Sequence, residues 1–403
     1  MSGTGRASGA VQAAPASQQG MRRQNLAVVI GAVAAHGPLS RADVAGHTGL
    51  TRPAVSSMVD ELIARGALTE TDTAPTGRVG RPGRALALSD RGPAGLGLEI
   101  GVTHLAACVV DLRGQARVWR RVERANAGRP PGQVLAEAAA LGAEAESEAA
   151  ALGLRVEGRV LAVPGVVPNE PGGLVANAPN LGWQAVRPAD HWPEPDTVPE
   201  PENEANLGAL AEQWHGGRPS ETFVHVSAEA GIGAALVVGG QLFRGARGFA
   251  GELGHLPVHP GGARCACGAR GCLEQYAGEA AVLREAGLEC IGDPVALLAE
   301  RAGAGDPSTL RALDRAGRAL GLALASAVNL IDPDGLVLGG AYAELADWLL
   351  PSIRAELAAR VIVRPWPPEA VRPSALGRRG PVLGAAWSTV RRIIADPTRL
   401  PVR

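Results

Sequence analysis

The sequence predicts an α/β protein in which an N-terminal winged helix-turn-helix precedes a two-lobed body. Between Arg22 and Ile63, apolar side chains recur at helical spacing in three short segments. From Gly95 onward, predicted strands alternate with helices, and a pair of strands joined by a glycine-bearing turn occurs in each half of this region. The 403 residues suffice for two or three hydrophobic cores, and a formal net charge of -1 excludes binding driven by overall charge.

The chain divides into three predicted regions. Residues 1–20 are rich in Ala, Ser, Gly and Gln without apolar periodicity, so we expect a disordered tail. Residues 21–92 form the predicted DNA-binding domain, and residues 93–403 form the body. Within the body we expect lobe one over about 93–195 plus a C-terminal helix over about 383–397, and lobe two over about 196–382.

One segment imitates a secretory signal. Residues 21–37 combine a basic start, an apolar run and small residues. We favour a helix of a soluble domain, because a polar tail precedes the run and a second helical pattern follows it. No apolar stretch approaches the length needed to cross a membrane, so the sequence predicts a cytoplasmic protein.

The first two predicted helices have clear boundaries. The core-facing residues of the first are Leu26, Val29, Ile30 and Val33, and Gly37-Pro38 ends it. Ser40 caps the second helix, which carries Val44 and ends near Gly49.

Thr51 is expected to cap a third helix. Its predicted core face consists of Val55, Val59, Leu62 and Ile63. Arg52, Ser56 and Ser57 would lie on or near the opposite face, towards solvent or a ligand. Two short helices joined at a glycine are typical of a helix-turn-helix, whose second helix reads the major groove.

A basic loop after the third helix predicts a wing. We expect strands at Leu68–Thr71 and Ala85–Leu88 around a loop with three arginines, which could contact phosphates or enter a minor groove. The alternative is an ordinary solvated linker. The candidate DNA-contacting residues are Ser40, Thr51, Arg52, Pro53, Ser56, Ser57, Arg78, Arg81 and Arg84.

The body shows strands, helices and glycine turns in alternation. Residues 96–114 are interpreted as two strands meeting at Asp111–Gly114, and residues 159–167 as a strand ending in Pro-Gly. Helices are expected at Val134–Leu152 and Leu310–Asn329, a second strand pair within 222–242, and a buried strand at 335–340. The repeated strand pairs predict two related lobes around a cleft.

Four potential metal ligands crowd into one short loop. His255, Cys265, Cys267 and Cys272 are the ligands of a closed, structural tetrahedral zinc site. Glycines at 261, 262, 268 and 271 would let the loop fold tightly. The alternative is a group of thiols that only fill space.

The two remaining cysteines have no such pattern. Cys108 lies in an apolar run and Cys290 in a helix-like stretch, so neither suggests a disulfide. An odd number of cysteines with a clustered metal motif fits a reducing compartment.

Four motifs give the chain a family resemblance. They are APNLGW (178–183), ENEANLGALAE (202–212), FRGARGFAGELGH (243–255) and CACGARGCLEQY (265–276). With them the chain resembles the ROK family, which groups sugar kinases of the actin-like ATPase (ribonuclease H-like) fold with repressors that add a winged helix. The resemblance implies that the histidine and three cysteines hold zinc, and that the histidine also reaches the sugar. The implied sugar contacts are Asn180, Asn203, Glu204, Glu252, His255 and Glu274.

The chain departs from the kinase pattern at three places. Glu204 stands where a ROK kinase has an aspartate base, which displaces the carboxylate by one methylene. Val102 adds bulk to the first phosphate-type turn, and Glu229 would place a carboxylate beside the phosphates of ATP. We therefore assign no catalytic residue and treat Glu204 as a degenerate base position.

These departures favour a sugar-responsive regulator over an enzyme. The sequence predicts a repressor of carbohydrate genes that binds an inverted-repeat operator as a homodimer or tetramer. One alternative is a ROK sugar kinase that retains weak ATP-dependent activity through Glu204. Another is a regulator whose cleft binds a protein partner or no ligand.

Overall fold

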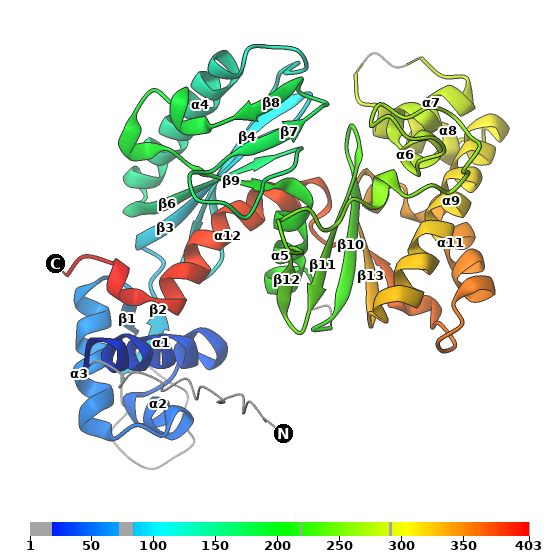
Figure 1. The fold of residues 1–403 in the computed structure, drawn as a ribbon. Helices are drawn as coiled ribbons and strands as arrows, with labels where there is room; N and C mark the ends of the chain where they lie inside the picture. Colours follow the sequence, from blue (N-terminus) through cyan, green and yellow to red (C-terminus); the bar gives the residue numbers. More distant parts are fainter. Residues whose placement is uncertain (1–17, 72–83, 218–219, 290–291, 403) are drawn as a thin grey trace, which may run out of the picture. The chain divides into compact units, whose positions relative to one another are not determined.

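The computed structural model describes residues 18–71, 84–217, 220–289 and 292–402, which fall into two compact units (Figure 1). The first comprises Met1–Ser89 together with Arg391–Arg403, and the second comprises Asp90–Val390. The C-terminal stretch therefore groups with the first unit, whereas the sequence analysis placed it in the body. Cys290, Arg78, Arg81 and most of the predicted tail lie outside the described residues.

The first unit is a winged helix-turn-helix. Its elements are α1 (Gln18–His36), α2 (Arg41–Thr48), α3 (Arg52–Ala64), β1 (Leu68–Thr71) and β2 (Ala85–Leu88). β1 and β2 pair antiparallel as predicted. The four predicted core residues of α1 are all buried. Gly49 ends α2 in the left-handed conformation, with φ 71°, which glycine adopts without a steric cost.

Two details of the helix pair differ from expectation. Ser40 forms a full capping box with Asp43, as its side chain predicts, but the Thr51 side chain makes no cap hydrogen bond. Ile63 is only half-buried, and Met58 completes the core face of α3 instead. Both residues fit an apolar stripe, so spacing alone does not separate them.

The end of the chain packs within the first unit. The 3₁₀ turn η6 (Pro397–Arg399) contacts α1, and the Arg65 guanidinium donates a hydrogen bond to the Leu400 carbonyl. Arg65 also pairs with Glu61 on its own helix at 2.7 Å. These contacts explain why the C-terminal residues belong with the DNA-binding fold.

Lobe one of the second unit is built on a five-stranded sheet. The strand order is β5-β4-β3-β6-β9, with bounds β3 (Gly92–Ile100), β4 (His104–Asp111), β5 (Ala116–Glu123), β6 (Leu154–Val163) and β9 (Glu200–Asn203). Helix α4 (Pro131–Ala151) packs on it. β3 and β4 join at residues 101–103, so the prediction that two strands meet at Asp111–Gly114 was wrong. The segment Asp111–Gly114 instead joins β4 to β5, a strand that was not predicted from the sequence. Because β9 pairs with β6, lobe one extends to Asn203 rather than to 195.

Lobe two contains a second five-stranded sheet. The order is β12-β11-β10-β13-β14, with bounds β10 (Phe223–Ala228), β11 (Ile232–Val238), β12 (Gln241–Phe243), β13 (Gly335–Gly340) and β14 (Val371–Pro373). The predicted strand pair and buried strand are confirmed as β10, β11 and β13. A hydrophobic core joins β10 and β13 to the helices of this lobe. The body thus contains two sheets, each with a pair of strands joined by a glycine-bearing turn, and we call the parts built on them lobe one and lobe two.

The remaining elements complete the body. They are β7 (Val175–Ala178), β8 (Trp183–Val186), α5 (Glu204–His215), α6 (Glu274–Ala277), α7 (Glu279–Ala286), α8 (Pro294–Gly303), α9 (Pro307–Ile331), α10 (Ala341–Glu344), α11 (Ala346–Arg360) and α12 (Gly380–Ala395).

Glycines allow α12 to lie against the lobe-one sheet. A Cβ atom on Gly97 would stand 2.1 Å from the Val382 carbonyl oxygen, and one on Gly95 would stand 2.3 Å from that of Ala386. Real side chains do not approach backbone so closely. The helix therefore packs here only because β3 presents hydrogen atoms in place of side chains.

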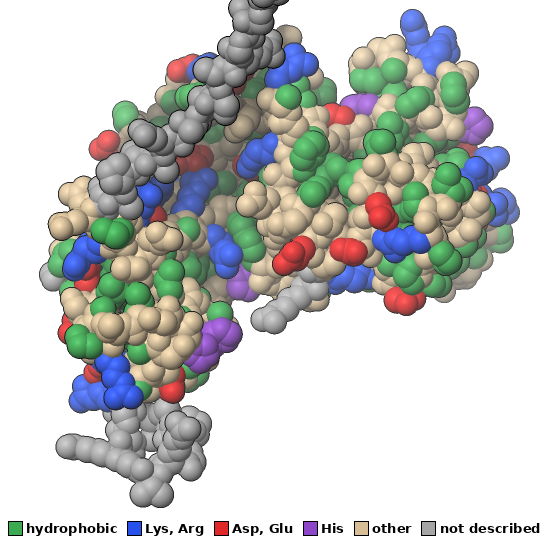
Figure 2. Space-filling view, turned by 60° about the horizontal axis from the view of Figure 1, so that its bottom comes forward, with side chains coloured by type: hydrophobic (Ala, Val, Ile, Leu, Met, Phe, Trp, Pro, Cys, Tyr) green, Lys and Arg blue, Asp and Glu red, His purple; other side chains and the backbone are tan. Residues whose placement is uncertain are grey.

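The surface matches the near-neutral composition. In Figure 2, acidic and basic side chains are scattered over the visible face among hydrophobic and other residues. Within the described ranges, no helix combines the length and apolar character required to cross a bilayer. The cytoplasmic location stays a prediction.

Replacing Gly97 with alanine tests this packing. We expect Gly97→Ala to lower the free energy of unfolding by about 1–3 kcal/mol, because the new methyl group must displace α12. Urea denaturation followed by circular dichroism measures the change. Gly303→Ala is the control, since no atom lies within 4 Å of its added Cβ. Equal unfolding midpoints for Gly97→Ala and the parent would contradict the packing argument.

Candidate functional site

A cavity of about 320 Å³ opens between the two lobes of the second unit, and we call it the first cavity. Pro164 and Gly165 border it from lobe one, and the β10–β11 turn borders it from lobe two. The six residues assigned to sugar by resemblance all line it: Asn180, Asn203, Glu204, Glu252, His255 and Glu274. The structure therefore brings together side chains that lie almost a hundred positions apart in sequence.

Asn203 has a structural role at this cavity. It is the N-cap of α5, and its Oδ1 accepts hydrogen bonds from the backbone N–H groups of Ala205 (2.9 Å) and Asn206 (3.1 Å). Its Nδ2 donates to the Gly165 carbonyl at 2.8 Å. Only one N–H of the side-chain amide is left for a ligand.

Gly231 lets two cavity side chains approach the backbone. A Cβ at this position would lie 2.9 Å from both Asn180 Nδ2 and Glu274 Oε2. Glu274 Oε2 also accepts a hydrogen bond from the Ile232 N–H at 3.2 Å. The absence of a side chain at Gly231 thus leaves room for an amide and a carboxylate at the wall of the first cavity.

Sequence reasoning missed two residues of the first cavity's polar network. Asn206, only 6% exposed, lines the cavity and donates to Glu202 Oε1 at 2.9 Å. Glu202 also pairs with Arg244. Asn206 lies one helical turn after Asn203, so the i, i+3 spacing could have identified it.

The potential metal ligands do converge. The ligand atoms of His255, Cys265, Cys267 and Cys272 all lie within 4.8 Å of one another. The Cys267 and Cys272 Sγ atoms are 3.7 Å apart, close to the roughly 3.8 Å expected for two thiolates bound to one zinc at about 2.3 Å. Three sulfurs and one imidazole at such distances fit a tetrahedral metal site.

The fold of the metal loop depends on Gly271. Its φ is 71°, and a Cβ there would lie 1.6 Å from the His259 carbonyl oxygen. Only glycine fits this turn. It immediately precedes Cys272, which is fully buried.

His255 faces two ways. Its Nδ1 lies 3.8 Å from Cys265 Sγ, while its Nε2 lies 3.9 Å from Glu252 Oε2. A metal on Nδ1 would leave the proton on Nε2, where it can be donated to a carboxylate or a ligand oxygen. The same ring thus borders both the metal cluster and the first cavity.

A second cavity, of about 380 Å³, adjoins the first, and both are lined by Pro164 and Glu204. Burial, followed by the charges of Glu99 and Glu229, raises the pKa of Glu204 well above its ordinary value. Within the described part of the chain, the Glu204 carboxyl has no hydrogen-bond or ion-pair partner.

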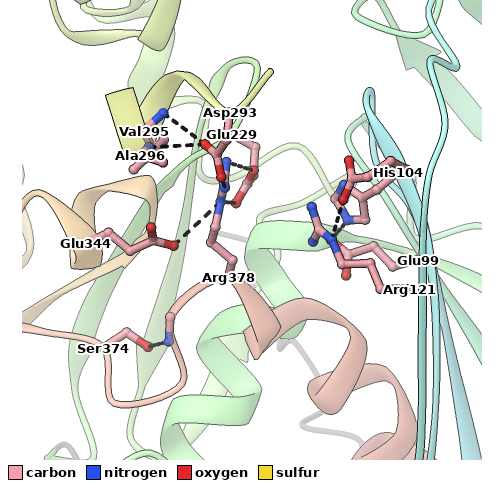
Figure 3. Close-up of polar contacts among 12 residues, drawn as sticks. Glu99, His104, Arg121, Glu229, Asp293, Val295, Ala296, Glu344, Ser374 and Arg378 are labelled. Carbon is pink, nitrogen blue, oxygen red and sulfur yellow. Dashed lines mark hydrogen bonds and ion pairs between the residues drawn. The ribbon is translucent and has the colours of Figure 1, made fainter. Parts of the chain in front are cut away.

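Arg378 collects three carboxylates at one wall of the second cavity (Figure 3). Its Nε and Nη2 each lie 3.2 Å from a different Glu229 oxygen, and Nη1 lies 3.0 Å from Asp293. Glu344 approaches Nε at 3.8 Å. Although burial disfavours its charge, Glu229 and the other carboxylates raise the pKa of Arg378.

The expectation for Glu229 therefore needs a correction. The sequence predicts a Glu229 carboxylate that would repel the phosphates of ATP, whereas in the structure Arg378 binds both oxygens of this carboxylate. Burial raises the pKa of Glu229, and the Arg378 charge opposes that shift. Arg378 lies 149 positions away in sequence, so no local pattern could reveal the pair.

The first strand turn is also filled. Val102 is half-buried against the lobe-one core and lines the second cavity. A Cβ on Gly101 would lie 2.3 Å from the His104 ring, which occupies the space beside this turn.

The candidate DNA-contacting residues lie in varied surroundings. Arg52, Pro53 and Ser57 are exposed on α3, and Thr51 is exposed just before it. Ser56 is half-buried, and Ser40 uses its hydroxyl to cap α2. Arg84 is exposed but pairs with Glu70 at 2.9 Å, whereas Arg78 and Arg81 fall outside the described ranges.

Comparison with known proteins supports both units. A model of the ROK family matches residues 95–391, and one of the MarR family matches residues 27–79. The xylose repressor of Bacillus subtilis (strain 168) is 28% identical over 373 residues, covering 92% of this chain and 95% of that protein.

Two solved structures have similar folds. One is a ROK family transcriptional regulator, a homologue of the E. coli MLC protein, with a TM-score of 0.77 and 24% identity over 94% of this chain and 98% of the other. The second is a ROK family glucokinase from Streptomyces griseus in complex with glucose and AMPPNP, with a TM-score of 0.63 and 28% identity over 73% of this chain and 98% of the other. Since the family match spans nearly the whole second unit, the chain belongs to the ROK family.

Proposed function

We propose that this protein is a sugar-responsive transcriptional repressor. The observation that carries the proposal is the combination, in one chain, of an exposed recognition helix with a cavity lined by carboxylates, amides and an imidazole. The full-length similarity to a xylose repressor supports it. The target would be double-stranded operator DNA and the effector a sugar or sugar derivative.

The first unit supplies the DNA contacts in this proposal. α3 would enter the major groove with Arg52, Pro53 and Ser57, because its buried face leaves these residues outward. An inverted-repeat operator requires two copies of the chain, so we propose that a homodimer or tetramer binds it.

The first cavity would recognise the sugar through its hydroxyl groups. Carboxylates accept hydrogen bonds, while the amide of Asn180 and the Nε2–H of His255 donate them. A sugar whose hydroxyl groups leave one of these buried side chains without a hydrogen bond binds more weakly. The first cavity would therefore select sugars with one particular arrangement of hydroxyl groups.

We propose no phosphoryl transfer for this body. In the second cavity Glu229, Asp293 and Arg378 form one ion-paired cluster, and Val102 occupies the first turn. Glu204 is one methylene longer than the aspartate that serves as the base in a ROK kinase, so its carboxylate is displaced from the base position. The kinase alternative would need ATP to displace the Arg378 cluster.

The metal in this proposal is a structural zinc ion. His255, Cys265, Cys267 and Cys272 would hold it, and a site with four protein ligands has no open position for chemistry. The ion would fix the loop that carries Glu274 and the adjacent wall of the first cavity.

Removing one cavity amide tests sugar recognition. We expect Asn180→Ala to weaken binding of the effector sugar about tenfold, since it leaves a ligand oxygen without a donor. Isothermal titration with a panel of hexoses and pentoses gives the affinity, and a mobility-shift assay shows whether the same sugar changes operator binding. Gln184→Ala, an exposed amide outside the cavity, should bind as the parent does. If no sugar binds or changes the shift, the proposed function is wrong.

Removing one thiolate tests the metal. We expect Cys267→Ser to lose zinc and the sugar response while the first unit still binds DNA, because the metal loop belongs to the other unit. Metal content per chain is measured by mass spectrometry. His259→Asn, in the same loop but outside the cluster, should keep the ion. A parent protein without zinc that still responds to sugar contradicts the assignment.

Removing one arginine tests the recognition helix. We expect Arg52→Ala to weaken operator binding by about tenfold or more relative to non-specific DNA, since it removes a base-reading side chain. Arg23→Ala removes the same charge from an exposed position on α1 and serves as the control. The measurement is a mobility shift on the promoter fragment of the protein's own gene. Equal losses for both variants would place the interface elsewhere.

A further inference from the structure

Asn206 is a buried polar residue of the first cavity to which the family resemblance assigns no sugar contact. It lies on α5 one helical turn after Asn203, lines the cavity and is 6% exposed. Its side-chain amide has two N–H donors and one carbonyl acceptor, and a buried amide that lacks hydrogen-bond partners is costly. The direction in which each end of the amide points therefore decides what Asn206 can bind.

The nitrogen end of this amide is held by Glu202. Asn206 Nδ2 donates to Glu202 Oε1 at 2.9 Å, and the same oxygen accepts the Asn203 backbone N–H at 2.8 Å. Arg244 forms an ion pair with the other oxygen of Glu202. A carboxylate only accepts hydrogen bonds, so it binds the nitrogen of the amide and not its oxygen. The network thus fixes which end of the Asn206 amide faces Glu202.

The oxygen end of the amide is left free. Within the described residues, Asn206 Oδ1 accepts no hydrogen bond, and it is not sealed off from solvent. Because the rest of Asn206 is buried and the residue lines the first cavity, the open oxygen faces this cavity. Asn206 therefore offers an uncharged acceptor to a ligand.

Asn203 and Asn206 present opposite groups to the cavity. The oxygen of Asn203 caps α5 and its Nδ2 donates to the Gly165 carbonyl, so one N–H is left for a ligand. Asn206 leaves an oxygen instead. A hydroxyl group on a sugar ring can donate to this oxygen, whereas a ring position that carries only hydrogen cannot.

We propose that Asn206 determines which sugar the first cavity binds, because its Oδ1 accepts a hydrogen bond from one ring hydroxyl. Glu202 is a positioning residue that fixes the orientation of the amide. The inference rests on the proposed function, in which the first cavity binds a sugar. A sugar that lacks this hydroxyl, or carries it on the other side of the ring, leaves the Asn206 oxygen unpaired and binds more weakly.

Titration calorimetry with deoxy sugars tests the role of Asn206. The probes are the hexose or pentose that the parent binds most tightly and its monodeoxy analogues, each of which lacks one hydroxyl group. We expect Asn206→Ala to bind the complete sugar about tenfold more weakly than the parent does. One analogue should bind equally well to both proteins, because it lacks the hydroxyl that faces Oδ1. The other analogues should show the same loss as the complete sugar.

Exchanging the two partners tests the role of Glu202. In Glu202→Gln the new side chain both donates and accepts, so the Asn206 amide can turn over. The preference for the complete sugar over that one analogue should then fall. In the double variant Glu202→Gln/Asn206→Asp an amide again faces a carboxylate, and one carboxylate oxygen remains for the sugar. We expect the double variant to recover most of the preference, which a purely structural role of either residue would not produce.

Gln213→Ala is the matched control. It removes an amide of the same helix whose Nε2 donates to the Gly240 carbonyl at 2.6 Å, outside the first cavity. This variant should keep the preference of the parent for every pair of sugars. Thermal unfolding followed by circular dichroism shows whether each variant is folded at the temperature of the titration. Should Asn206→Ala be unfolded, the comparison of Glu202→Gln with the double variant decides.

Two results would overturn the inference without touching the proposed function. If Asn206→Ala weakens binding of the complete sugar and of every analogue equally, Asn206 only supports the fold. If the double variant is no more selective than Glu202→Gln, Glu202 does not position the amide. A parent protein that binds no sugar at all would instead contradict the proposed function.

Discussion

The site depends on the hydrogen bonds of Asn203, where the chain passes from one lobe to the other. Up to this residue the chain is β9 of the lobe-one sheet, and directly after it α5 begins and packs on β10 and β11 of lobe two. The amide of Asn203 satisfies two N–H groups of α5 and the Gly165 carbonyl at once. Because the cap fixes the start of the helix, it also fixes Glu204 between the two cavities.

Electrostatics separates the roles of these cavities. The first presents amides, carboxylates and an imidazole, a mixture of donors and acceptors that suits hydroxyl groups. The second cavity is lined by more carboxyl groups than cationic groups, and Arg378 neutralises part of this excess negative charge through its ion pair with Glu229. Within the described residues, Glu204 and Glu279 at this cavity make no hydrogen bond or ion pair. A kinase with this lining would repel the triphosphate that it needs.

The two units are joined by the chain at two places. One connection runs from β2 into β3, and the other is α12, which is counted with the body up to Val390 and with the first unit from Arg391. The Arg378 cluster immediately precedes this helix, and Ser374 orders the approach to it by accepting the Gly377 N–H at 3.0 Å. The wall of the second cavity that Arg378 forms thus lies just before Gly380, the first residue of α12.

The sequence by itself determined the local elements and the chemistry of the metal loop. Helical spacing, caps and glycine turns act over a few residues, so α1 to α3, both wing strands and the four ligands from His255 to Cys272 could be predicted. The spacing of apolar residues did not show that Met58 rather than Ile63 belongs to the core face of α3. Strand β5 was not predicted, and neither was the role of Asn206, which follows Asn203 by one helical turn. Only the tertiary structure placed Arg378 on Glu229, β9 in the lobe-one sheet and the C-terminal residues on α1. Such pairings join residues far apart in the chain, and they depend on how the sheets pack rather than on any local pattern.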